Sequence, residues 1–315
     1  MKISENALNL LVARSVKGAG RKWINDNLVG VCSDEGVVAR LSAKLAPSLT
    51  VAQFRAFRES LRQRIVASLG GYIDGVVGAG DADFPKISGG VRASDRPIAL
   101  FYRGNLSLLA NCSRNVAVIG VLNPTEAVVA EEANVVKRLV EGGNCIVSGL
   151  ALGCDTVGHR TALCGGGKTI AFLPGPLSDV NPPSNRPLAE EIVRTGGLLV
   201  SEYGEAARSR QEFLGRYAER DRLQAMFVRC VVLAASYAPN NAVGGDSGSR
   251  FAMSKAIEYG IPRMVIYDKA HADDDLMYEL NRMAIREGAT IINPNNLTTL
   301  RLPECRPTLR QGSLF

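Results

Sequence analysis

Short runs of aliphatic and β-branched residues alternate with amphipathic stretches of helical spacing from about residue 97 to residue 292. Continuous apolar strands are typical of parallel sheets, because the helices that connect successive strands cover both faces. The alternation therefore predicts an α/β fold with a mostly parallel sheet. The expected strands are residues 98–102, 116–119, 145–147, 169–173, 198–200, 231–234, 264–267 and 290–292, and the expected helices are residues 125–141, 156–164, 187–195, 249–259 and 275–287.

The order of these segments predicts a Rossmann-like, doubly wound domain over residues 76–293. Ligands of such sheets bind beyond the carboxyl ends of the strands, so a functional site is expected in the loops there. Residues 1–75 are predicted to form a small, basic helical domain of the SAM-like or helix-hairpin-helix-like kind. Residues 294–315 are predicted to form a tail that lies on the domain or leaves it.

Positive charge is concentrated at the start of the chain. Residues 1–70 contain 11 Lys and Arg but 5 Asp and Glu, whereas the other residues contain 26 of each kind. A basic segment on a neutral body suits a polyanionic partner, because binding releases the counterions of phosphates. A helical surface that merely keeps the protein in solution is an equally good interpretation of the charge alone.

The composition argues against several classes of protein. No apolar run is long enough to span a bilayer, and the N-terminal residues lack a signal-peptide cleavage site, so we expect no membrane association. Seven cysteines without a C-x-x-C pair indicate buried, reduced thiols and a cytoplasmic location. With two histidines and no cysteine-rich cluster, neither a metal nor a cofactor is expected.

Four loops at predicted strand–helix junctions or strand starts are rich in Gly, Ser or basic residues. Glycine allows backbone N–H groups to approach an oxyanion, and the N-terminus of a helix adds unpaired donors and a favourable dipole. Such loops favour phosphate, although Gly-rich turns of this kind also occur for packing alone. The four loops are residues 120–125, 148–155, 165–168 and 244–250.

In this order the loops resemble those of the DprA/Smf family of DNA-processing proteins. Residues 148–163 (SGLALGCDTVGHRTAL) are similar to the family pattern S-G-x-A-x-G-I-D-x-x-A-H-x-x-A-L, and residues 167–171 (GKTIA) to G-K-T-I-A. Further similarity covers residues 83–85, 100–105, 181–188, 199–203, 217–222 and 247–260. The resemblance implies a non-catalytic protein that binds single-stranded DNA, loads a RecA-type recombinase on it, and forms a homodimer. DNA uptake, recombination and defence against mobile DNA are all settings that fit.

The sequence departs from the family pattern at two loops. The family usually carries G-S-R after the first core strand, where this chain has Gly120-Val121-Leu122, and an arginine where it has Leu152. Each missing arginine is expected to remove a phosphate contact and to weaken salt-dependent binding. Arg250, where members often have an apolar residue, could compensate.

Loops and resemblance together select the candidate residues. Arg220 and Arg222 flank Asp221, so they could line a DNA groove or form an ion pair inside the fold. Lys168 could bind phosphate or be a solvated residue at the edge of a strand. His159 is expected to be structural and Asp155 to cap a helix. The residues predicted to bind DNA or phosphate are Gly120, Ser148, Gly149, Arg160, Lys168, Asn185, Arg220, Arg222, Ser247, Gly248, Ser249 and Arg250.

Two other functions remain open. Related Rossmann-like proteins release a base from a nucleotide with a glutamate that follows a Gly-rich loop, but Ala252 and Met253 occupy that region here. A non-catalytic variant of this reading is a sensor of a nucleotide-derived ligand. The other alternative is an adaptor, in which docking to recombination or replication proteins matters more than DNA binding.

The last residues of the chain resemble the short Q-x-x-L-F peptides that dock on the bacterial sliding clamp. Leu314 and Phe315 would fill an apolar pocket, and Gln311 would form a hydrogen bond at its rim. Packing of both apolar residues on the domain is the alternative. The sliding clamp is therefore a candidate partner alongside the recombinase.

Overall fold

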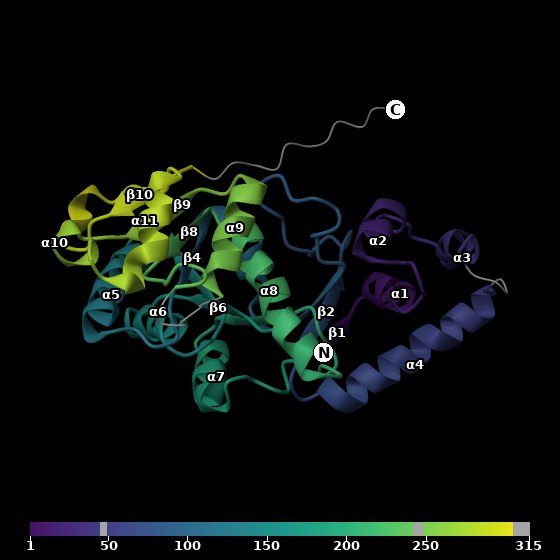
Figure 1. Ribbon diagram of the computed structural model, residues 1–315. Coiled ribbons are helices and arrows are strands. Elements are labelled where there is room, and N and C mark those ends of the chain that lie inside the picture. Colours follow the sequence, from purple (N-terminus) through teal and green to yellow (C-terminus); the bar gives the residue numbers. More distant parts are fainter. Residues whose placement is uncertain (45–48, 242–247, 305–315) are drawn as a thin grey trace.

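A ten-stranded sheet organises the chain (Figure 1). The computed structural model describes residues 1–44, 49–241 and 248–304. The strand order is β1-β2-β3-β7-β6-β5-β4-β8-β9-β10. The strands are β1 (Lys2–Ile3), β2 (Gly75–Gly78), β3 (Ala99–Gly104), β4 (Asn115–Ile119), β5 (Cys145–Ser148), β6 (Thr169–Phe172), β7 (Leu198–Ser201), β8 (Cys230–Leu233), β9 (Arg263–Ile266) and β10 (Thr290–Ile292).

Strand β4 is the topological switch point of the sheet. The chain adds β5, β6 and β7 successively on one side of β4, and β8, β9 and β10 on the other, all in parallel. Strand β3 is antiparallel to both of its neighbours, β2 and β7. This confirms the predicted Rossmann-like fold and places the loops that follow β4, β5 and β8 around one crevice.

The helices pack on the sheet in two groups. Helices α5 and α6 contact each other and strands β4 and β5, whereas α8 and α9 lie side by side and contact β8 (Figure 1). The sequence predicted all eight strands from residue 98 onward within two residues at each end, but it missed the long helix α8. The helices are α1 (Glu5–Arg14), α2 (Arg21–Asn27), α3 (Asp34–Ser42), α4 (Val51–Leu69), α5 (Glu126–Glu141), α6 (Cys154–Cys164), α7 (Arg186–Arg194), α8 (Arg210–Met226), α9 (Ser249–Tyr259), α10 (Lys269–Ala272) and α11 (Glu279–Arg286).

The N-terminal helices are joined to the sheet rather than merely tethered to it. Strand β1 pairs in parallel with β2, and α1 packs on β2 and β3. The apolar side chains of α1 belong to the same buried cluster as Ala171 of β6 and Leu199 of β7. The predicted domain boundary after residue 75 therefore falls inside β2.

The segment that follows β10 lies along the domain. Leu297, Leu300 and Leu302 pack against the main core cluster, and the Arg229 side chain donates hydrogen bonds to the carbonyl of Pro303 at 3.0 and 2.6 Å. The part of the predicted tail up to residue 304 thus lies on the fold. Gln311, Leu314 and Phe315, the residues predicted to dock on a sliding clamp, lie outside the described residues.

Within the described residues, no helix combines the length and the apolar character that crossing a membrane requires. The same residues contain no group of three or more His, Cys, Asp or Glu side chains that could hold a metal ion.

Replacing Leu8 with alanine tests the connection between α1 and the sheet. Leu8 is fully buried in the cluster that α1 shares with β6 and β7. We expect Leu8→Ala to reduce the free energy of unfolding by about 3 kcal/mol in one cooperative transition, because the cavity would lie in a shared core. Urea denaturation monitored by circular dichroism and by Trp23 fluorescence would measure it. Two separate transitions, with Leu8→Ala affecting one of them, would contradict a shared core.

Candidate nucleic-acid site at the switch point

A pocket of about 170 Å³ lies where the sheet switches direction. It is bounded by the end of β4, the loop that follows β5, the middle of α8 and the first turn of α9. This is the edge at which doubly wound sheets bind ligands. The lining residues are Ile119, Gly120, Leu122, Ala151, Asp155, Tyr217, Arg220, Asp221, Gln224, Gly248, Ser249 and Ala252.

The loop that follows β5 is held rigid by Asp155 and Asn185. The Asp155 carboxylate accepts hydrogen bonds from the backbone N–H groups of Gly149 (3.1 Å) and Ala151 (3.2 Å). The Asn185 amide, which is 3 % exposed, donates to the carbonyls of Leu150 and Ala151. Asp155 therefore binds the loop and does not cap α6, where Gly153 occupies the N-cap position. Asn185, predicted to contact phosphate, does not line the pocket. It stabilises the loop through these hydrogen bonds.

Arg220 forms the floor of the pocket. Its guanidinium is 3.0 Å from the Asp221 carboxylate through Nε and 3.7 Å from the Asp155 carboxylate through Nη1. With the Gln224 amide oriented so that its oxygen faces donors, this oxygen accepts from Arg220 Nη1 at 2.7 Å and from the Gly149 N–H at 3.2 Å. Arg220 is 5 % exposed, so these ion pairs lie inside the fold. The internal ion pair that was the alternative to a DNA contact is therefore present.

Glycine at position 149 makes room for this guanidinium. A Cβ atom at that position would lie 0.9 Å from Arg220 Nη1 and 2.1 Å from Arg220 Cζ. No other residue type fits without moving the arginine. Gly149, one of the predicted site residues, thus shapes the floor of the pocket.

The floor carries little net positive charge. Burial raises the pKa of the Asp221 carboxyl to about 7, the charge of Arg220 opposes that rise, and the charge of Asp155 adds to it. One guanidinium therefore faces one carboxylate and a second that is about half protonated near neutral pH. Such a floor suits a neutral group with several hydrogen-bond donors and acceptors, such as the edge of a nucleobase, better than a phosphate.

The rim offers groups of a different kind. Helices α6 and α9 both begin there, and the N-terminus of a helix attracts anions. The Ser249 hydroxyl donates to the Gly120 carbonyl at 2.9 Å, and a Cβ atom at Gly120 would lie 2.5 Å from Cys154 Sγ. Gly120, Gly248 and Ser249 line the pocket beside these helix N-termini. That they contact phosphate remains a prediction. Ser247 lies outside the described residues.

Arg222 lies on the other side of α8. It is 2 % exposed and pairs with Glu202 (2.5 Å) and Glu219 (3.2 Å), and Glu219 also pairs with Arg21 of α2 at 2.7 Å. Arg222 therefore forms an ion pair inside the fold, which was the alternative to lining a DNA groove. Replacing Arg222 with alanine should destabilise the fold, because removing one partner leaves buried charges uncompensated.

The remaining predicted residues are spread over the domain. Lys168 precedes β6, so it lies at the amino edge of the parallel strands, opposite the pocket, and donates to the Thr195 carbonyl. Arg160 is exposed on α6, and the buried Ser148 hydroxyl donates to the Val118 carbonyl at 2.7 Å. The Arg250 guanidinium lies 4.8 Å from the ring centre of Phe251.

His159 is fully buried and structural, as expected. Its Nδ1 lies 2.6 Å from the Thr169 hydroxyl, which donates to the Ile146 carbonyl. Burial lowers the pKa of His159 to about 4, so the ring is neutral at physiological pH.

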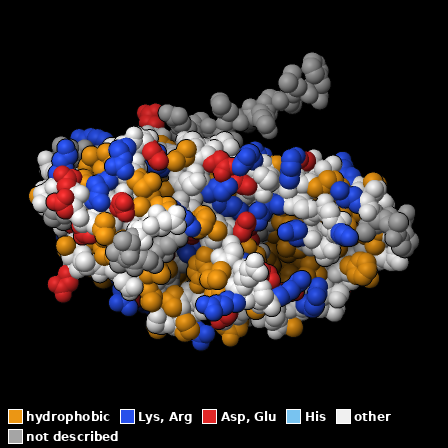
Figure 2. All heavy atoms as spheres, viewed as in Figure 1, with side chains coloured by type: hydrophobic (Ala, Val, Ile, Leu, Met, Phe, Trp, Pro, Cys, Tyr) orange, Lys and Arg blue, Asp and Glu red, His pale blue; other side chains and the backbone are white. Residues whose placement is uncertain are grey.

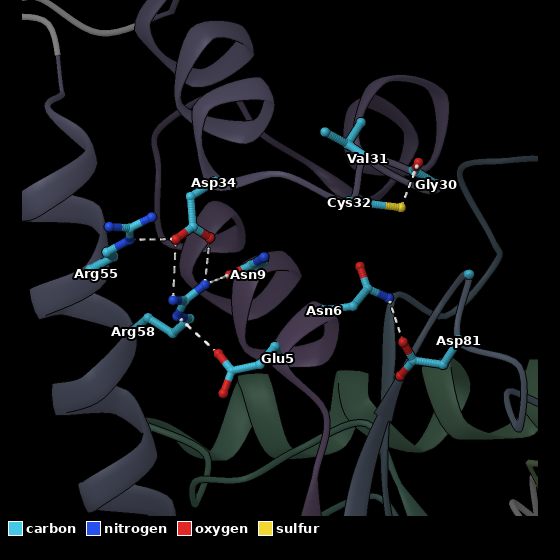
Figure 3. Close-up of a pocket in the computed structure, with 11 residues that line it drawn as sticks. Glu5, Asn6, Asn9, Gly30, Val31, Cys32, Asp34, Arg55, Arg58 and Asp81 are labelled. Atoms are coloured by element: carbon cyan, nitrogen blue, oxygen red, sulfur yellow. Dashed lines mark hydrogen bonds and ion pairs between the residues drawn. The ribbon is translucent and has the colours of Figure 1, made fainter.

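A second pocket, of about 520 Å³, lies among the N-terminal helices (Figure 3). Arg55 and Arg58 of α4 both point to Asp34 of α3, with a closest N–O distance of 2.6 Å in each pair. Arg58 also pairs with Glu5 of α1 at 3.1 Å. The charges in this pocket compensate one another, so its arginines make a weak case for an anion site.

The basic excess of the first 70 residues is likewise partly compensated. On the face that Figure 2 shows, Lys and Arg side chains are interspersed with Asp and Glu. Contact of this segment with a polyanion remains a prediction. The ion-paired basic residues of the segment include Lys2, Arg21, Lys22, Arg55, Arg58 and Arg62.

The sequence did not reveal three groups of the pocket. Tyr217 and Gln224 were not singled out, and Leu122 was noted only as a missing arginine. A signal for the first two was present, because residues 217, 220, 221 and 224 recur at helical spacing and so share one face of α8.

Comparison with known proteins agrees with this architecture. The model of a family described as DNA recombination-mediator protein A matches residues 75–300. The DNA processing protein DprA of Streptococcus pneumoniae is 34 % identical over 169 residues, which are 53 % of this chain and 54 % of that protein. The chain thus matches about half the length of this curated relative.

Two solved structures are also similar. The X-ray structure of S. pneumoniae DprA has a TM-score of 0.68 at 23 % identity and covers 95 % of this chain and 98 % of that one. A DNA processing protein A from Helicobacter pylori, whose structure concerns its single-stranded DNA binding mode, has a TM-score of 0.51 at 27 % identity. That match covers 64 % of this chain and 85 % of the H. pylori chain.

Replacing Gly149 with alanine tests the geometry of the pocket floor. The added methyl group would displace the Arg220 guanidinium from its two carboxylates, so we expect a loss of about 3 kcal/mol or more in the free energy of unfolding. Gly215→Ala on the exposed side of α8, where a Cβ meets nothing within 4 Å, is the matched control and should gain up to about 1 kcal/mol. Thermal unfolding would measure both. Equal midpoints for Gly149→Ala and the wild type would contradict the geometry.

Glu132 predicts a dependence of stability on pH. Its carboxyl is fully buried on α5, and burial raises its pKa well above the usual value. The folded state therefore binds a proton that the unfolded state has lost, so stability falls as the pH rises above about 4.3. Asp221 acts in the same direction up to its pKa of about 7.

We expect Glu132→Gln to reduce the fall in stability as the pH rises above about 4.3, by up to about 1.4 kcal/mol per pH unit, because the titrating group is gone. Urea denaturation at several pH values would measure this. Glu126→Gln, at an exposed position of the same helix, should retain the wild-type slope. A Glu132→Gln slope equal to that of the wild type would show that Glu132 does not titrate as described.

Proposed function

Because the chain belongs to the DNA recombination-mediator protein A family, we propose that it binds single-stranded DNA at the switch-point pocket and presents the strand to a RecA-type recombinase, without catalysing a reaction. The single observation that carries the proposal is the pocket itself. A small, nearly neutral hydrogen-bonding floor lies beside two helix N-termini at the carboxyl edge of the sheet. The single-stranded DNA binding mode of the H. pylori protein supports the same ligand.

The geometry favours unpaired bases. A pocket of about 170 Å³ is too narrow for a duplex, whereas one unstacked base can enter it and meet Arg220, Asp221 and Gln224. A duplex would first have to release that base, which costs a few kcal/mol. The phosphates on either side of the base would then approach the N-termini of α6 and α9. This arrangement reads no particular sequence strongly, as in other single-strand binders.

The contacts of Ser249 in the pocket and of the buried His159 support the absence of catalysis. The Ser249 hydroxyl donates to a backbone carbonyl, and the neutral His159 and its partner Thr169 are both fully buried and do not line the pocket. Base release by related folds requires a glutamate near the start of α9, where the small side chain of Ala252 lines the pocket.

A nucleotide-derived ligand is the second candidate, and one observation favours it. The pocket has room for one base, whether that base belongs to a free nucleotide or to a DNA strand. A free nucleotide is therefore a reasonable occupant. Competition between nucleoside monophosphates and DNA separates the two, since a sensor would prefer the free nucleotide.

Three assembly properties belong to the proposal as well. We propose homodimerisation through the α/β domain, loading of the recombinase, and docking of Gln311, Leu314 and Phe315 on a sliding clamp. A peptide of residues 306–315 titrated against purified clamp tests the last of these. Binding that survives replacement of both Leu314 and Phe315 with alanine would contradict it.

The central test is a fluorescence-polarisation titration with oligodeoxythymidine of about 20 nucleotides and with a duplex of the same length. We expect tighter binding of the single strand, and about tenfold weaker binding by Tyr217→Ala, because a stacking ring that lines the pocket is lost. Tyr72→Ala, which removes an exposed tyrosine between α4 and β2, is the matched control and should bind as the wild type does. Equal or tighter binding of the duplex would contradict the proposal.

A further inference from the structure

Two exposed leucines flank the switch-point pocket. Leu122 follows β4 and is 50 % exposed, and Leu152 follows β5 and is 46 % exposed. Single exposed leucines are common on protein surfaces, but two on adjacent loops beside a polar pocket form an apolar contact surface. Leu122 itself lines the pocket together with Ser249.

The backbone fixes both loops against each other. The Cys154 N–H donates to the Val121 carbonyl at 3.1 Å, and Gly153, in the left-handed region with φ of 70°, lies so close that a Cβ would be 2.5 Å from the Leu122 carbonyl carbon. Asp155 and Asn185 hold the second loop from behind. The leucines are therefore presented by rigid backbone, so little entropy is lost when a ligand packs on them.

The two loops that carry these leucines contain no basic residue of their own. Residues 120–125 and 149–153 contain no Lys or Arg, and the floor of the pocket is nearly neutral. A ligand at these two loops thus meets apolar side chains, whereas the charged side chains lie on the floor of the pocket (Arg220, Asp221) and in the first turn of α9 (Arg250). A strand whose base enters the pocket would place the next base within reach of this surface.

We propose that Leu122 and Leu152 contact the bases of the bound single strand, so that part of the affinity of this chain does not depend on salt. The inference rests on the proposed function and specifies the chemistry of its site. Apolar contact with bases releases no counterions, whereas each arginine–phosphate contact adds about one unit to the slope of log affinity against log salt.

The test is a titration of Leu122→Ala/Leu152→Ala with oligodeoxythymidine at about 50 and about 200 mM salt. We expect roughly tenfold weaker binding at both concentrations, because the apolar contact area is lost, with an unchanged salt slope. Leu122→Met/Leu152→Met should retain most of the affinity, since it keeps the apolar surface. Leu122→Arg should bind more tightly at low salt, with a slope steeper by about one.

The matched control is Ile257→Ala, which removes a 53 % exposed aliphatic side chain near the end of α9, about 7.5 Å along the helix from Ala252 of the pocket. It should bind as the wild type does. Wild-type affinity of the double alanine variant would overturn the inference and leave the proposed function intact, with the leucines free to serve a protein partner. Absence of single-strand binding by the wild type would instead refute the proposed function itself.

Discussion

The buried guanidinium of Arg220 is the interaction on which the rest of the site depends. It compensates Asp155 and Asp221 at once, and those carboxylates connect α8 to the loop that follows β5. Because that loop contacts the loop that follows β4, one charged group sets the position of both. The fold leaves room for it by a single device, the absence of a side chain at Gly149.

The proposed site combines three kinds of group: a hydrogen-bonding floor, two helix N-termini and an apolar rim. Arginine used internally cannot also neutralise a phosphate at full strength, so the floor of the pocket is suited to a base edge. In the proposed complex, the phosphates of the strand lie at the helix N-termini, and the faces of its bases contact Tyr217, Leu122 and Leu152. Affinity built in this way depends on unpaired, accessible bases, which is the property that distinguishes a single strand from a duplex.

The sequence predicted the parts of the molecule that follow one physical rule. Continuous apolar runs identified the strands of the parallel sheet. Three of the four loops singled out from the sequence follow β4, β5 and β8 at the edge where the pocket lies, whereas residues 165–168 precede β6 at the opposite edge. Helix α8 escaped detection because its buried stripe is polar, with Arg216, Arg220, Asp221, Arg222 and Gln224 all buried. Strand β1 has two residues, too few for a periodic signal, and two of the four residues of β2 are glycines, which strands disfavour. Side chains two positions apart on an α-helix point in nearly opposite directions. Arg222 therefore lies on the other side of α8 from the pocket that Arg220 lines.

Photochemical crosslinking tests the location of the site most directly. An oligodeoxythymidine that carries a photoreactive thymidine analogue would be irradiated in complex with the full chain, and the adducts mapped by mass spectrometry. The account predicts adducts on Tyr217, Leu122 or Leu152, the groups that border the pocket and its mouth. Adducts confined to helices α1–α4 would place the DNA on the N-terminal segment and contradict the claim that the switch-point pocket binds the strand.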